Sequence, residues 1–221
     1  MPTLHPTQLP THPRRLAAAG SAALACGLAL GVVLRHEGPV RTGELRLDER
    51  IGTDHEAALT CVARVIDVAL SPPGAIAIAV ALALVVALRN RWSALALLVA
   101  TAGGWLSVGA GKVLFARHRP PTGLVHALVV ETGSDSFPSG HTAFAAALVG
   151  GVALALRVSG RSTLWAWVVG VPFVAVVAAS RLYLGAHYLG DVVASNLFAG
   201  GTIALGTSLV ALVVRSRGAA A

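Results

Sequence analysis

Residues 16–34 read LAAAGSAALACGLALGVVL, a run of 19 residues without a charge. An apolar helix of about 20 residues is long enough to span the hydrocarbon core of a bilayer. Arg14 and Arg15 precede the run, as basic residues also do in a cleaved signal peptide, whose apolar segment is usually only about 7–15 residues long. We therefore expect an uncleaved transmembrane helix, with cleavage as the alternative.

Five more apolar stretches follow this run. They lie at about 73–88, 92–115, 141–156, 164–180 and 190–214. Before the first of them, the breaker SPPG at 71–74 separates a span from an amphipathic helix that starts near Glu56, and a short interfacial helix is expected at 45–51. The sequence thus predicts an all-α fold, a polytopic membrane bundle with about six transmembrane helices.

These spans are expected to form one membrane domain at residues 16–214. Residues 1–15 are rich in proline and poor in apolar side chains, which is typical of a disordered tail. Residues 215–221 form a second short tail. Both tails are expected to be cytoplasmic.

The composition supports a membrane environment and argues against nucleic-acid binding. Only 12% of the 221 residues are charged and 55% are hydrophobic, whereas about a quarter of the residues in a soluble domain are charged. The net charge of +7 is spread in small groups between the apolar runs. A nucleic-acid-binding protein would gather such charge on one face.

The loops on the two sides of the predicted bundle differ in charge. On one side, each loop or tail carries two arginines and no acidic residue, at 1–15, 89–91, 157–161 and 215–221. Cytoplasmic loops are enriched in Lys and Arg, so this side is expected to be cytoplasmic. The opposite loops, at 35–55, 117–140 and 182–189, then face outward from the plasma membrane.

Three short polar motifs interrupt the apolar background. The first is KVLFARHRP at 112–120, in which Lys112 and Arg119 are about two helical turns apart at the outer end of a span. Two cations on one helix face can bind an anion such as a phosphate group. Taken alone, they can also be side chains that snorkel to the membrane surface, so the interpretation depends on the other motifs.

The second motif is PSGH at 138–141, which follows a polar stretch and opens an apolar helix. Ser139 is a natural N-cap, and the unpaired N–H groups of the first turn can bind phosphate oxygens. His141 is placed to donate a proton to a leaving oxygen, because an imidazole changes charge near neutral pH. The alternative is that His141 is only an interfacial polar residue.

The third motif is SRLYLGAHYLGD at 180–191, which adds Arg181 as a third cation. His187 and Asp191 are four residues apart and would lie on one face of a helix. Asp191 would then fix the tautomer of His187 and favour its cationic form, as in catalytic His–Asp pairs. A purely structural pair is the alternative, although ionisable residues at membrane depth are costly without a function.

In this order and at these spacings, the motifs resemble the signature of the type 2 phosphatidic acid phosphatase superfamily, Lys-x6-Arg-Pro, Pro-Ser-Gly-His and Ser-Arg-x5-His-x3-Asp. The resemblance covers roughly residues 56–214 and implies a small bacterial lipid phosphatase. It implies that His187 attacks phosphorus, that Asp191 orients His187, and that His141 protonates the leaving group and later activates water. The phosphate-binding residues that it implies are Lys112, Arg119, Ser139, Gly140 and Arg181.

The resemblance also implies a reaction without a metal or other cofactor, because fixed cations and a helix N-terminus stabilise the charge. The expected partners are a membrane lipid substrate and the bilayer, with homo-oligomerisation left open. Arg117 and His118 are at best secondary phosphate or headgroup contacts, and His126 is a weaker one. Arg64 and Asp67 either pair on one helix face or lie at the mouth of the site.

Other functions are compatible with parts of this pattern. Vanadium haloperoxidases share the signature but are soluble and larger. A catalytically silent membrane relative would depart from the signature, whereas this chain keeps both histidines and the aspartate. A phosphotransferase needs only a lipid or alcohol acceptor in place of water, so it stays open. Among hydrolase substrates, undecaprenyl pyrophosphate is slightly favoured over phosphatidic acid and phosphatidylglycerol phosphate, since the chain resembles small bacterial members.

Overall fold

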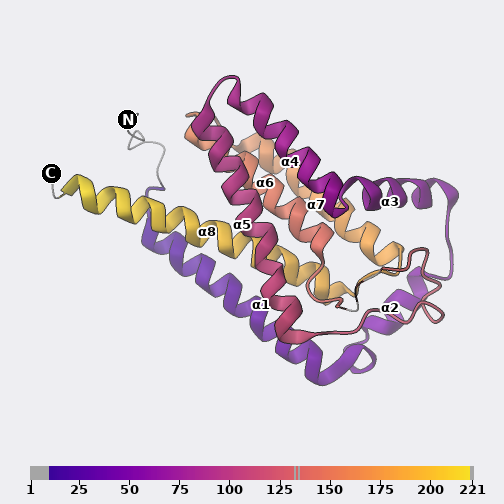
Figure 1. The fold of residues 1–221 in the computed structure, drawn as a ribbon. Helices are drawn as coiled ribbons and strands as arrows, with labels where there is room; N and C mark the ends of the chain where they lie inside the picture. The colour runs from indigo at the N-terminus through magenta and orange to yellow at the C-terminus, as the bar shows by residue number, and fades with distance from the viewer. Residues whose placement is uncertain (1–9, 132, 134, 220–221) are drawn as a thin grey trace.

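The computed structural model describes residues 10–131, 133 and 135–219. These residues form eight helices and no β-strand, which confirms the predicted all-α fold (Figure 1). In chain order the helices are α1 (Pro13–Arg41), α2 (Glu44–Ile51), α3 (Ala57–Ala69), α4 (Pro72–Ala87), α5 (Arg91–Phe115), α6 (Gly140–Val158), α7 (Leu164–Tyr183) and α8 (Leu189–Ala219). Of the predicted tails, residues 1–9 and 220–221 lie outside the described residues.

The number of spans agrees with the prediction. Five helices are long and apolar enough to cross a membrane, namely α1, α5, α6, α7 and α8. The pair of α3 and α4 forms a sixth candidate, bent by 73°. The helices α2 and α3 coincide with the predicted interfacial helix and the predicted amphipathic helix. The chain is therefore a multi-pass membrane protein.

The bend between α3 and α4 follows from the SPPG sequence at 71–74. Pro72 and Pro73 occupy the first turn of α4, where a missing N–H group is tolerated, and they prevent α3 from continuing. A Cβ atom on Gly74 would lie 2.3 Å from the main-chain oxygen of Ala69. Only glycine therefore permits this close approach of the two helices.

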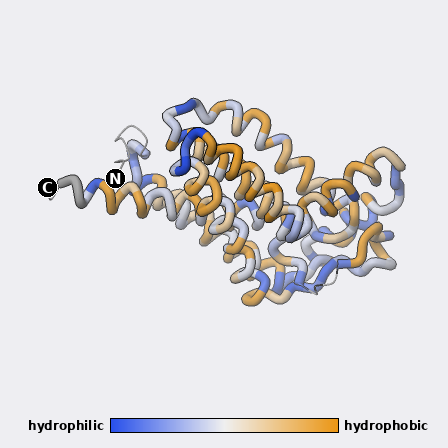
Figure 2. The backbone as a smooth tube through the Cα atoms, turned by 45° about the horizontal axis from the view of Figure 1, so that its top comes forward, coloured by the Kyte–Doolittle hydropathy of each residue, from blue (hydrophilic) through white to orange (hydrophobic). Residues whose placement is uncertain are grey.

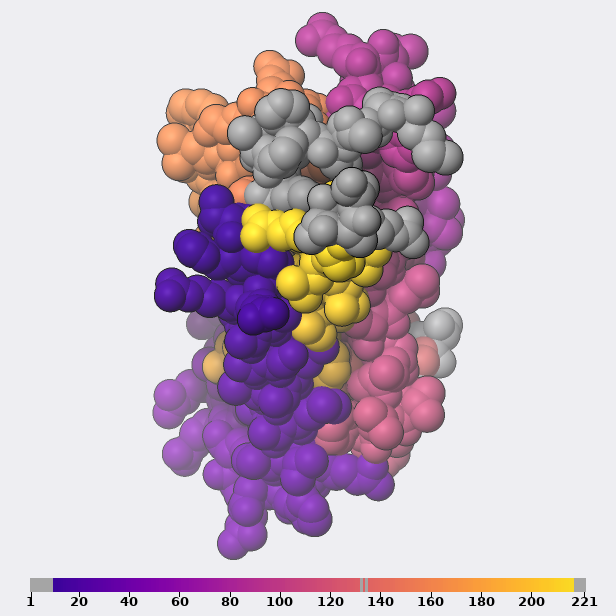
Figure 3. All heavy atoms as spheres, turned by 90° about the vertical axis from the view of Figure 1, so that its left-hand side faces the viewer, coloured from indigo at the N-terminus to yellow at the C-terminus, as the bar shows by residue number. Residues whose placement is uncertain are grey.

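The first and last spans, α1 and α8, pack side by side (Figures 1 and 3). A Cβ atom on Gly20 would lie 2.8 Å from the main-chain oxygen of Gly201, and one on Gly201 would lie 2.9 Å from that of Gly20. Small residues of this kind let membrane helices approach closely. Farther along α1, Gly31 makes room for the ring of Phe115 on α5.

Hydrophobic residues follow the spans, and hydrophilic segments gather toward the ends of the bundle (Figure 2). At one end, the segment that connects α5 to α6 is held by aromatic packing. The ring of Phe137 lies 5.1 Å from that of Phe115 and 6.3 Å from that of Phe198. A Cβ atom on Gly111 would lie 2.6 Å from Cδ of Pro138, so Gly111 lets Pro138 rest directly on α5. These contacts fix the position of the chain just before α6.

Candidate active site

The three motifs lie at one end of the bundle. The first motif ends α5, the second begins α6, and the third runs from the end of α7 into the first turn of α8. The α4–α5 and α6–α7 turns lie at the opposite end (Figure 1). Antiparallel packing of consecutive spans therefore brings together side chains that are far apart in the sequence.

His187 lies in the turn between α7 and α8 and is buried. Its Nδ1 atom is 3.6 Å from Oδ2 of Asp191, and its Nε2 atom is 3.2 Å from Nη1 of Arg119. A guanidinium group can only donate hydrogen bonds. The lone pair is therefore on Nε2, and the ring proton is on Nδ1, facing Asp191. The two residues lie together as expected, although His187 precedes the helix on which the sequence pattern placed it.

The protonation of His187 is set by its surroundings. Burial lowers the pKa of His187 from its ordinary value of 6.5 to about 4, with smaller contributions in the same direction from Arg119 and Arg181. Asp191 acts in the opposite direction and does not cancel the effect of burial. His187 is thus neutral at pH 7, which is the form that has a free lone pair.

Ser139 is the N-cap of α6, as the sequence predicts, and it is buried. Its hydroxyl makes no capping hydrogen bond to the described first turn, but accepts one from the hydroxyl of Thr142 at 3.3 Å. A Cβ atom added to Gly140 would meet nothing within 4 Å. The N-terminus of α6 therefore opens onto free space, where its N–H groups can bind an anion.

Arg119 and Lys112 reach this end of the bundle from α5 and the segment after it. Arg119 donates hydrogen bonds to the main-chain oxygens of Gly133 at 2.7 Å and Ala186 at 2.8 Å. The Nζ atom of Lys112 donates to the main-chain oxygen of Asp135 at 2.7 Å. Carbonyl groups therefore orient both cations toward this end of the bundle, and Arg119 also lies near the carboxylate of Glu131.

Arg181, the third predicted cation, is fully buried between two acidic side chains. Its Nη1 atom is 2.5 Å from Oδ1 of Asp67, and its Nη2 atom contacts Oε1 of Glu131. The other oxygen of Glu131 is 3.8 Å from Nη2 of Arg119. Sequence reasoning missed Glu131, whose only signal is its place in the polar stretch before the PSGH motif. For Asp67, these contacts favour the interpretation that places it at the site.

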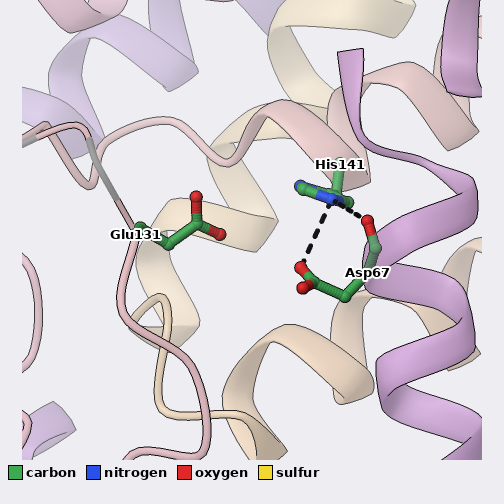
Figure 4. A group of neighbouring side chains, drawn as sticks. All are labelled: Asp67, Glu131 and His141. Atoms are coloured by element: carbon green, nitrogen blue, oxygen red, sulfur yellow. Dashed lines mark hydrogen bonds and ion pairs between the residues drawn. The ribbon is translucent and has the colours of Figure 1, made fainter. Parts of the chain in front are cut away.

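His141, Asp67 and Glu131 converge from α6, α3 and the α5–α6 segment (Figure 4). The Nε2 atom of His141 is 3.0 Å from the main-chain oxygen of Asp67, so this nitrogen carries a proton that it donates. Ligand atoms of the three residues lie within 4.8 Å of one another, a spacing that could hold a metal ion. Arg181 already pairs with both carboxylates and supplies their countercharge.

Arg117, for which the sequence predicts at best a secondary phosphate or headgroup contact, pairs with two buried carboxylates. Its two terminal nitrogens lie 2.6 Å from Oδ1 of Asp191 and 2.5 Å from Oε2 of Glu44, so buried carboxylates already occupy the guanidinium group. His118 forms an isolated backbone bridge with Asp135. His126 is exposed on the same segment.

Comparison with known proteins agrees with this architecture. The sequence model of the PAP2 superfamily matches residues 93–215, which include all three motifs. The fold is similar to the crystal structure of the first transmembrane PAP2-type phosphatidylglycerolphosphate phosphatase from Bacillus subtilis, with a TM-score of 0.70 and 20% identity over 90% of this chain and 95% of that chain. No curated protein matches the chain. Family and fold together support a lipid phosphatase in general terms. The chain therefore belongs to the PAP2 superfamily.

Proposed function

We propose that the protein hydrolyses a lipid phosphate monoester or a lipid pyrophosphate through a phosphohistidine intermediate at His187. The observation that carries the proposal is the orientation of this side chain. Its Nε2 atom lies 3.2 Å from Arg119, and its protonated Nδ1 atom faces Asp191. A neutral nucleophile is thus held next to a fixed cation, where a bound phosphorus atom would be within reach.

In the proposed complex, the phosphate oxygens replace the carboxylate of Glu131 at the arginines. The groups that bind them are the side chains of Lys112, Arg119, Arg181 and Ser139 and the backbone N–H group of Gly140. These donors are oriented before the substrate arrives, which is how an active site stabilises developing charge most effectively. Removing a single donor of this kind typically lowers kcat by about 10²–10³-fold.

In the first step, Nε2 of His187 attacks phosphorus, and the bond from phosphorus to the leaving oxygen breaks. The leaving oxygen takes the electron pair of that bond and a proton from Nε2 of His141, which enters this step as a cation and leaves it neutral. The proton on Nδ1 of His187 stays in place, and Asp191 stabilises the positive charge of the phosphorylated ring. In the second step, His141 takes a proton from water, the water oxygen attacks phosphorus, and inorganic phosphate leaves His187.

The proposed location is the plasma membrane, with the site facing outward. This orientation is supported by the arginine-bearing turns at 89–91 and 157–161, which lie at the end of the bundle opposite the motifs. Undecaprenyl pyrophosphate is the first substrate to test, followed by phosphatidic acid and phosphatidylglycerol phosphate. All three offer a terminal phosphate group at a membrane surface.

The experiment is phosphate release from these three lipids by the purified protein in detergent with excess EDTA. We expect release from at least one lipid, and a loss of about 10³-fold or more in His187→Ala, because this variant lacks the nucleophile. His36→Ala, an exposed histidine on α1, is the matched control and keeps the wild-type rate. Full activity of His187→Ala would refute the mechanism. A phosphohistidine that forms without phosphate release would indicate a phosphotransferase instead.

A further inference from the structure

Asp191 belongs to a buried network that extends beyond the phosphate-binding residues. Its Oδ1 atom accepts a hydrogen bond from Nη1 of Arg117 at 2.6 Å. Its Oδ2 atom accepts one from the backbone N–H group of Tyr188 at 2.9 Å and another from the hydroxyl of Ser136. Three donors on one carboxylate fix both its orientation and its ionised state.

Arg117 is itself held by Glu44, the first residue of α2. The Nη2 atom of Arg117 is 2.5 Å from Oε2 of Glu44, and the guanidinium group lies over the ring of Tyr188, 4.4 Å from its centre. The Oε1 atom of Glu44 accepts a hydrogen bond from the backbone N–H group of Gly190 at 2.7 Å. Glu44 therefore holds both Arg117 and the first turn of α8, which carries Asp191.

The network is deeply buried. The side chains of Arg117, Glu44 and Asp191 are 6%, 8% and 0% exposed. A buried ion pair seldom stabilises a fold more than well-packed apolar residues would, whereas breaking one leaves an unpaired buried charge. Stability of the fold therefore does not explain the ion pairs of Arg117 with Glu44 and Asp191. The carboxylate of Asp191, at one end of this network, faces His187.

We infer that Glu44 and Arg117 are positioning residues for the nucleophile, Glu44 by fixing Arg117, and Arg117 by fixing the carboxylate that orients His187. The inference rests on the proposed phosphohistidine mechanism. Glu44 lies outside the residues matched by the family, 93–215. The short helix α2 thus adds to the catalytic machinery a group that the three motifs do not contain.

The charges of the network suit the chemical step. Asp48, one turn after Glu44 on α2, is buried, and burial raises its pKa to about 8, so it is mostly neutral at pH 7. The carboxylates of Glu44 and Asp191 then share a single cation, Arg117. The excess negative charge lies on the Nδ1 side of His187. It stabilises the positive charge that the ring acquires when it is phosphorylated.

Steady-state kinetics of substituted proteins test the inference. We expect kcat to fall about 10-fold in Glu44→Gln and about 100-fold in Arg117→Gln. The loss of kcat in Arg117→Lys should lie between these two values. Losses of this size are typical when a residue that supports a functional group is removed. KM and the inhibition constant of inorganic phosphate should change by less than about twofold, because neither residue touches the phosphate-binding groups. Glu49→Gln, which removes a charge from the same helix α2, is the matched control and keeps the wild-type rate.

An unchanged kcat in folded Glu44→Gln and Arg117→Gln would overturn the inference. Equal changes in kcat, KM and phosphate inhibition would also overturn it, because they indicate a general structural role. If Arg117→Gln does not fold, the decision rests on Glu44→Gln and Arg117→Lys, which retain the buried cation. The kcat values of these two variants are compared with that of Glu49→Gln at a temperature at which all three proteins are folded.

A second readout does not depend on turnover. In protein labelled with ¹⁵N-histidine, the NMR signal of Nδ1 of His187 should shift in Glu44→Gln and Arg117→Lys but not in Glu49→Gln. If the wild type releases phosphate from no lipid but the signal still shifts in Glu44→Gln and Arg117→Lys, the proposed hydrolase is refuted and the positioning of His187 is retained. An active wild type with an unshifted signal and an unchanged kcat in the variants would refute the positioning role alone.

Discussion

The Nε2 atom of His141 lies 3.0 Å from the main-chain oxygen of Asp67 and 3.6 Å from its carboxylate. Asp67 therefore orients the proposed general acid from α3, while its carboxylate also pairs with Arg181. Asp67→Asn keeps the main-chain contact but removes the carboxylate charge next to His141, so kcat on an alkyl phosphate should fall by about 10–100-fold. The loss should be smaller on p-nitrophenyl phosphate, whose leaving group needs no proton.

Kinetics on the two substrates check this prediction. Arg64→Gln changes an exposed charge on the same helix and should leave both rates unchanged. Equal losses on both substrates in Asp67→Asn would contradict the role in protonation. Such a result would assign the effect to the ion pair with Arg181 instead.

Glu131 is expected to compete with the phosphate group of the substrate. Its carboxylate contacts Arg181 and lies 3.8 Å from Arg119, so an incoming phosphate has to displace it. Glu131→Gln should therefore lower the inhibition constant of inorganic phosphate by about 3–10-fold, because the neutral side chain binds the arginines less tightly. The measurement is competitive inhibition, with Glu37→Gln, an exposed residue of α1, as the control. Weaker phosphate binding in Glu131→Gln would mean that Glu131 organises the arginines instead.

The low pKa of His187 predicts how stability depends on pH. The pKa of His187 is about 4 in the folded protein, and the unfolded chain has the ordinary value of 6.5. Between pH 4 and 6.5 the unfolded chain therefore binds one more proton than the folded protein. The contribution of neutral His187 to stability is fully present above pH 6.5 and is lost as the pH falls toward 4. The difference in thermal midpoint between the wild type and His187→Gln should therefore change across this window and be constant above it. A difference that is constant from pH 4 to 8 would contradict the prediction.

Gly111 on α5 is expected to be essential for the position of the PSGH motif. A Cβ atom at this residue would lie 2.6 Å from Cδ of Pro138. Gly111→Ala should therefore displace the start of α6, lower kcat by at least about 10-fold and destabilise the fold by about 1–3 kcal/mol. Gly103→Ala on the same helix is the control, because a Cβ atom there meets nothing within 4 Å. Wild-type activity and stability in Gly111→Ala would show that Pro138 can move without consequence.

The outward orientation predicts chemical accessibility in intact cells. Thr122 is exposed on the α5–α6 segment, at the end of the bundle that carries the motifs. With Cys26 and Cys61 replaced, Thr122→Cys should react with a membrane-impermeant thiol reagent before lysis. A cysteine at Arg161, in the α6–α7 turn, should react only after lysis. The reverse pattern would place the site on the cytoplasmic side.

The spans and the main motif residues could be predicted from the sequence because both depend on local information. A run such as 16–34 is apolar wherever it lies, and the spacing of His187 and Asp191 brings them together across a single turn. The motif pattern likewise places Ser139 at a helix start, where the structure has it. Hydropathy is thus sufficient to predict the number of spans. The short spacings within the motifs are sufficient to predict the end of the bundle at which the polar groups meet.

The remaining site residues depend on contacts that local patterns do not encode. Glu131 reaches Arg181 because of the path of the α5–α6 segment, which has no regular period. The direction of Arg117 depends on where α2 folds back against the start of α8, and a basic residue next to a phosphate motif gives no indication of this. These assignments require the tertiary arrangement of the helices.

The close packing of α1 against α8, through Gly20 and Gly201, has a consequence for biogenesis. Chains are synthesised from the N-terminus, and membrane helices insert before they associate. Helix α1 therefore enters the bilayer before its main partner, α8, has been translated. Until α8 has inserted, the small-residue face of α1 is covered by lipid or by the insertion machinery. The two helices therefore associate only after both are in the membrane.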